Sequence, residues 1–255
     1  MTVQLSRIDE LALMTFDRPE VLNALNFELL RDLGAAIDQV AGGDAHALLV
    51  TGARSRAFCA GADVKELMDR SLAATRQGAA LGQAIFAKLD VLPIPSIALI
   101  NGYAFGGGLE LVLACTFRIA LPGARLGLPE IKRGLTPGYG GTQRLPRLIG
   151  EARALEMILT GRTVMAEEAL RIGLVNRVVD RDMLGVGVSF AREMACFSLP
   201  ALGFARDAVR RGLPTSLKEG LAIEADLNTL AFQTADAAEG MTAFLDKRQP
   251  VFRDK

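Results

Sequence analysis

The sequence predicts an α/β fold whose parallel strands are followed by a mostly helical C-terminal part. Short apolar runs at residues 47–50 and 97–100 are each followed by a loop that opens a helix, which is the alternation of a parallel sheet. Near Leu199 the strand patterns give way to helical periodicity alone. We therefore expect a core over residues 1–198 and a helical region over residues 199–255.

Composition narrows the class of protein. The chain has 255 residues, half of them hydrophobic, which is enough for a sizeable core. Lys plus Arg (29) equals Asp plus Glu (29), so no basic surface points to nucleic acid or an anionic membrane. Cys59, Cys115 and Cys196 form no metal or redox motif. We see no signal peptide and no apolar run of about 18 residues, and we expect a cytoplasmic protein.

The first half of the chain alternates strands and helices. A hairpin is expected over residues 3–16, and Asn26 is an N-cap candidate for an amphipathic helix that ends at Gly42-Gly43. Further elements are expected at residues 77–89 (helix) and 117–120 (strand).

The second half is mostly helical. Residues 126–143 are rich in Gly and Pro and predict an irregular loop. Beyond it we expect helices at residues 151–159, 166–172, 216–232 and 236–247, a strand at 174–179, and prolines that divide helices at Pro200 and Pro214.

A glycine triplet at residues 106–108 is the most informative stretch. It follows a strand and opens an apolar helix that carries one acid, Glu110. A helix start leaves N–H groups unpaired and partly positive, so it can hold an anionic oxygen. Glu110 lies three residues past Gly107 and returns to the same helix face. The triplet could instead serve only close packing. It is neither a dinucleotide fingerprint nor a P-loop.

Two further stretches are candidates for the same site. The first has small residues just before Asp63, which is a possible N-cap. Such residues would expose backbone amides at a second helix start, but an ordinary loop-to-helix turn could have the same sequence. Glu130 follows Pro129 in the Gly/Pro-rich loop. By itself it could be a solvated charge or the partner of Lys132 or Arg133.

Five stretches together resemble the enoyl-CoA hydratase/isomerase (crotonase) family. The resemblance runs in order along nearly the whole chain, and the joint match is very specific although each piece is weak. The stretches are FCAGADVKEL, INGYAFGGGLELVLACTFRIA, LPEIKRGLTPGYGGTQRLPRLIG, LTGR and EGMTAFLDKRQPVF. The resemblance implies a crotonase-like ββα spiral core and an acyl-CoA thioester substrate. It also implies a homotrimer or dimer of trimers, with the helical region 199–255 serving oligomerisation and site closure.

The resemblance also assigns residues. Ala62 and Gly107 match the two backbone N–H donors of the family's oxyanion hole, and Glu110 and Glu130 match the two glutamates of the hydratase subgroup. Substrate-binding positions, by the same resemblance, are Ala60, Asp63, Val64, Lys65 and Gly106. Cys59 is interpreted as a packing residue.

Hydration fits these residue types. Two N–H donors stabilise the enolate-like charge that develops on the thioester oxygen when water adds at C3. One carboxyl group takes the proton of water and C2 receives another proton, so two carboxyl groups suffice. No metal and no separate cofactor is expected, because coenzyme A is part of the substrate.

Four alternatives stay open. A double-bond isomerase needs only one acid/base. The protein could also hydrate a branched, methylglutaconyl-type thioester, because residues 108–110 and 221–224 resemble that subgroup of the family. A triad hydrolase would have to use His46, the only histidine, which we interpret as structural. An RNA-binding protein would show a basic helix face, but residues 67–88 carry only Arg70, Arg76 and Lys88.

Overall fold

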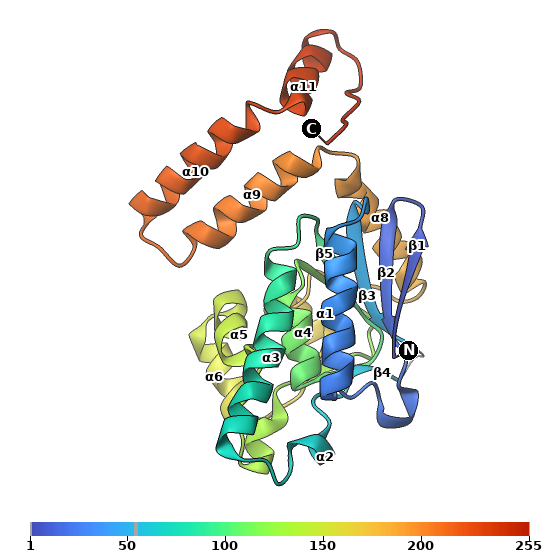
Figure 1. The fold of residues 1–255 in the computed structure, drawn as a ribbon, viewed down its shortest axis with the longest axis vertical. Coiled ribbons are helices and arrows are strands. Elements are labelled where there is room, and N and C mark those ends of the chain that lie inside the picture. The colour runs from blue at the N-terminus through green and yellow to red at the C-terminus, as the bar shows by residue number, and fades with distance from the viewer. Residues whose placement is uncertain (1, 54–55, 255) are drawn as a thin grey trace. The chain divides into compact units, whose positions relative to one another are not determined.

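The chain folds into two compact units, Met1–Ser189 and Phe190–Lys255, which are described separately. The computed structural model describes residues 2–53 and 56–254 (Figure 1). The division falls inside helix α8 (Met183–Ala195), before the predicted boundary at residue 199.

A six-stranded sheet forms the centre of the first unit. Its hairpin strands are antiparallel and every later pairing is parallel. The central strand SIALI is buried at every position, as expected where both faces are covered. In spatial order the strands are β1 (Val3–Ile8), β2 (Leu11–Phe16), β3 (Ala47–Gly52), β5 (Ser96–Ile100), β7 (Phe117–Ala120) and β10 (Arg177–Val178).

A second sheet of four very short strands accompanies the first. The sequence did not predict it, because two or three residues are too few to show an alternating pattern. The predicted strand at residues 174–179 also shrinks to two residues in the first sheet. The order of the second sheet is β4 (Ala57–Cys59), β6 (Tyr103–Phe105), β8 (Arg125–Gly127) and β9 (Val164–Met165).

Helices cover the sheets, and Figure 1 shows α1 and α3 side by side. The Asn26 side chain caps α1 by accepting the Leu29 N–H at 2.8 Å, as predicted. Helix α3 begins at Leu72, earlier than predicted, because Ser71 caps it. The helices are α1 (Phe27–Ala41), α2 (Val64–Leu67), α3 (Leu72–Asp90), α4 (Gly107–Ala114), α5 (Gly141–Ile149), α6 (Glu151–Thr160) and α7 (Ala166–Arg171).

The second unit is helical, with α9 (Leu199–Gly212), α10 (Leu217–Ala231) and α11 (Ala235–Leu245). The predicted divisions near Pro200 and Pro214 are confirmed: Pro200 lies in the first turn of α9, where its missing N–H costs nothing, and Pro214 lies between α9 and α10. Helix α10 begins with a capping box between Ser216 and Glu219. Among the described residues, no helix combines the length and hydropathy that a membrane crossing requires.

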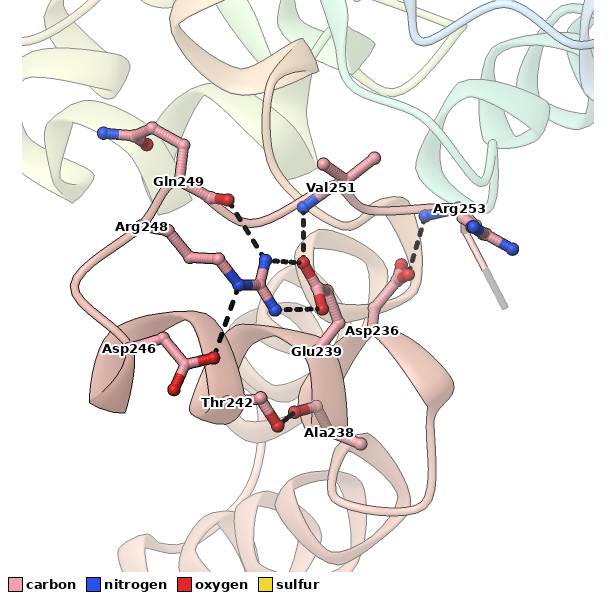
Figure 2. Close-up of polar contacts among 9 residues, drawn as sticks. All are labelled: Asp236, Ala238, Glu239, Thr242, Asp246, Arg248, Gln249, Val251 and Arg253. Atoms are coloured by element: carbon pink, nitrogen blue, oxygen red, sulfur yellow. Dashed lines mark hydrogen bonds and ion pairs between the residues drawn. The ribbon is translucent and has the colours of Figure 1, made fainter.

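Acidic side chains fasten the C-terminal tail to α11 (Figure 2). Arg248 donates to both carboxylate oxygens of Glu239, at 2.6 and 2.9 Å. Glu239 also accepts the Val251 N–H at 2.8 Å, and buried Asp236 accepts the Arg253 N–H at 2.7 Å. The tail is therefore held both by the Arg248 side chain and by its own backbone N–H groups.

Candidate active site

A cavity of about 280 Å³ lies within the first unit. It combines an apolar wall from α2 and α3 with two carboxyl groups and two glycine turns. Its lining residues include Phe27, Ala60, Gly61, Ala62, Val64, Leu67, Arg70, Gly78, Gly106, Gly107, Glu110, Glu130, Leu135 and Tyr139.

The Gly107 amide is an unpaired donor because Gly107 is the first residue of α4. The Ala62 amide is unpaired for a different reason. Leu25 bonds to the Gly61 carbonyl and the Asp63 N–H on either side of it, so the Ala62 N–H points away from that bridge. Within the described part of the chain, neither amide has a hydrogen-bond partner. Both line the cavity.

Glycines bring these two segments together. A Cβ atom built on Gly61 would lie 3.7 Å from the Gly107 nitrogen and 3.0 Å from the Phe105 carbonyl oxygen. Gly106 has φ 52° and ψ −126°, a backbone conformation that side chains other than glycine rarely adopt. Helix α4 therefore starts against the segment that carries Ala62, and two N–H donors face one cavity.

Glu110 is buried, with 1% of its surface exposed. Its Oε1 accepts the backbone N–H groups of Tyr139 and Gly141, both at 2.7 Å. Burial raises the pKa of Glu110 to about 7; the two N–H donors oppose that shift, and the charge of Glu130 adds to it. Glu110 can thus hold or release a proton near neutral pH.

Glu130 lies on a 3-10 turn, Pro129–Arg133, inside the stretch predicted to be irregular. That prediction was wrong, because the stretch also holds most of β8 and the start of α5. A Cβ atom on Gly106 would lie 2.8 Å from Glu130 Oε1, and Oε2 is buried without a partner. Burial raises the pKa of Glu130. No ion pair with Lys132 or Arg133 is found among the described residues.

The remaining predicted residues divide into two groups. Ala60, Val64 and Gly106 line the cavity. Asp63 instead caps α2, accepting the Lys65 N–H, and lies 3.6 Å from Arg18 in an ion pair. Neither Asp63 nor Lys65 is among the cavity-lining residues described.

Two other residues considered in the sequence are not among the cavity-lining residues described. Cys59 is buried, and burial raises the pKa of its thiol to about 12, in keeping with the predicted packing role. His46 donates its backbone N–H to Glu10 and is not among the lining residues described.

Sequence reasoning missed Tyr139, Phe27 and Arg70. Tyr139 is buried in the cavity wall, and its backbone N–H holds Glu110. The run Gly138-Tyr139-Gly140-Gly141 could have indicated the backbone donors, because glycines flank a buried turn there.

Known proteins are similar to this chain over nearly its full length. A crotonyl-CoA hydratase of Syntrophomonas wolfei is 40% identical over 253 residues, covering 98% of this chain and 97% of the relative. A short-chain-enoyl-CoA hydratase of Clostridium acetobutylicum is 37% identical, covering 97% and 95%. The crystal structure of an enoyl-CoA hydratase from Bacillus anthracis matches with a TM-score of 0.95 and 36% identity, covering 100% of both chains.

The predicted spiral α/β core is thereby confirmed. The sequence profile described as enoyl-CoA hydratase/isomerase matches residues 7–255. The chain belongs to the enoyl-CoA hydratase/isomerase family.

Proposed function

We propose that this protein is an enoyl-CoA hydratase, which reversibly adds water across the 2,3 double bond of a 2-enoyl-CoA thioester. The observation that carries the proposal is one cavity lined by two carboxyl groups and two unpaired backbone amides. The names of the relatives, which include crotonyl-CoA and short-chain-enoyl-CoA hydratases, support it.

In the proposed reaction the thioester oxygen accepts the N–H groups of Ala62 and Gly107. These donors stabilise the negative charge that forms on the oxygen as C3 is attacked, and each such donor typically contributes about 10²–10³ in rate. Because they belong to the backbone, they need no reorganisation during the reaction.

The two glutamates move the protons. Glu110 Oε1 is held by two N–H donors, which leaves Oε2 for the water. Glu110 takes a proton from the water as the O–C3 bond forms and the C2–C3 double bond opens. The Glu130 carboxyl gives its proton to C2. The raised pKa values of both acids fit this exchange, since one is needed ionised and the other protonated.

Absorbance of the conjugated enoyl thioester tests the proposal directly. Loss of the band on addition of the purified protein, with the 3-hydroxyacyl thioester as product, is the expected result. With a 3-enoyl thioester as substrate, appearance of the band through migration of the double bond from C3 to C2, without hydration of 2-enoyl thioesters, would replace hydration by isomerisation. No turnover on straight-chain or branched enoyl thioesters would overturn the proposal.

Three further statements belong to the same proposal. The protein works as a homotrimer or a dimer of trimers, in the cytoplasm, on an acyl-CoA substrate. It needs no cofactor, because the chemistry above uses only its own groups and the coenzyme A carried by the substrate. It has no role in binding nucleic acid or membranes.

A further inference from the structure

The Tyr139 ring forms a wedge in the wall of the cavity. The residue lines the cavity and only 7% of its surface is exposed. Its ring meets Phe86 of α3 edge-on, with the ring centroids 5.8 Å apart and the planes at 88°. The ring is therefore fixed by packing, in a residue that lines the cavity.

Two glycines make room for this ring. A Cβ atom on Gly82 would lie 2.3 Å from Tyr139 Cδ1, far inside contact distance. A Cβ atom on Gly107 would lie 3.1 Å from Tyr139 Cδ2. The ring thus occupies the space between α3 and the start of α4, which larger residues at positions 82 and 107 would fill.

The ring also stands beside the reacting atoms. Gly107 supplies one of the two donors to the thioester oxygen in the proposed reaction, and the ring is packed against it. The Tyr139 backbone holds Glu110. Acyl carbons beyond C3 that extend from the Gly107 amide toward α3 would meet the Tyr139 ring. The cavity, at about 280 Å³, is at the small end of ligand sites, which measure roughly 300–1,000 Å³.

We propose that Tyr139 is a specificity-determining residue that restricts the substrate to thioesters with short acyl chains. The proposal rests on the proposed function and adds the acyl class to it. Burial raises the pKa of the Tyr139 hydroxyl to about 12, so the wedge stays neutral at physiological pH. Its effect on the acyl chain is accordingly one of shape.

The experiment compares kcat/KM for 2-butenoyl-CoA and 2-decenoyl-CoA. Wild type should prefer the short substrate by at least about tenfold, since one misfitting methylene typically costs about 10–200-fold. Tyr139→Ala and the milder Tyr139→Leu should raise the long-to-short ratio by about tenfold or more, while Tyr139→Phe, which keeps the ring, should leave it near wild type. All retain the backbone N–H that holds Glu110.

Tyr103→Leu is the matched control, because Tyr103 is the only other tyrosine and is not among the cavity-lining residues described. Its ratio should stay at the wild-type value. Equal use of both substrates by wild type, or an unchanged ratio in folded Tyr139→Leu and Tyr139→Ala proteins, would overturn the proposal.

Binding separates this proposal from the proposed function. Calorimetry with butyryl-CoA and decanoyl-CoA needs no turnover. Tighter binding of decanoyl-CoA in Tyr139→Ala than in wild type, relative to butyryl-CoA, supports the wedge even if hydration is absent. An unchanged affinity ratio overturns the wedge even if hydration is present.

Discussion

The chain holds its two active-site carboxyl groups in different ways. Glu110 rises from the first turn of α4, and two backbone donors fix one of its oxygens. Glu130 sits on a 3-10 turn with one buried oxygen that lacks a partner. A fixed group suits the positioning of water, and an unpaired oxygen suits the exchange of a proton with carbon.

Replacement of either acid by glutamine should abolish proton transfer while keeping the shape. Glu110→Gln and Glu130→Gln should each lower the hydration rate by about 10²–10⁴. Because both act as a unit in one water-addition reaction, the double variant should be far less impaired than the product of the single losses. Nearly full turnover in Glu110→Gln, with Glu130→Gln inactive, would indicate one base and favour an isomerase.

Glu110 should also make stability depend on pH. Its pKa rises from 4.5 to about 7 on folding, so the folded protein binds the extra proton. The stabilisation is complete below about pH 4.5 and is lost as pH rises through about 7. Relative to wild type, Glu110→Gln should gain stability on the order of 3 kcal/mol across that range. Denaturant titration from about pH 5 to about pH 8 measures most of it. A constant difference would contradict the assigned pKa.

A site residue can be predicted from the sequence when its position in the site is determined by residues near it in the chain. Glu110 and Gly107 share one helix, so their spacing alone put them on one face. Glu130 needed the family resemblance, because nothing in its loop indicated burial. Tyr139 escaped notice because its position depends on the absence of a side chain at Gly82, on a helix distant in sequence.

At the scale of elements, the two backbone donors of the site lie at the starts of helices α2 and α4. Long strands and capped helices were predictable because their apolar patterns and capping residues are local. Strands such as β4 and β6 were not, because only their pairing with each other defines them. The sheet they form is what brings the segment containing Ala62 beside the start of α4.

Gly107→Pro isolates the donor at the start of α4. Proline is tolerated at the first position of a helix, so the fold should survive while the N–H is lost. Turnover should fall by at least about 10². Gly107→Ala is the control, since it adds a Cβ 3.1 Å from the Leu25 and Tyr139 side chains but keeps the N–H. Equal turnover in the two folded variants would refute the donor assignment.

At the scale of the whole molecule, the second unit leaves many apolar side chains exposed. Leu213 is 77% exposed, Leu217 80% and Phe244 83%. Exposed apolar surface of this kind marks an interaction site. The unit is therefore poorly suited to full exposure in water, which supports the proposed oligomer.

Light scattering at micromolar concentration should give three or six times the chain mass of 27.2 kDa. Phe244→Lys combined with Leu217→Lys should shift the population toward smaller species, because charges do not bury well in an apolar contact. Lys218→Ala, a change at a polar neighbour, should not. A monomer mass for the wild type would rule out the oligomer.

The amides at Ala62 and Gly107, and those that hold Glu110, all belong to the main chain. Mutation can exchange a side chain freely but hardly ever removes an N–H. The activating apparatus is consequently insulated from most substitutions, whereas the wall of side chains around it is not. Descendants of this chain could explore new acyl groups through positions such as Tyr139 or Leu135 while inheriting the same chemistry. The same main-chain donors can in this way serve proteins that prefer different acyl groups.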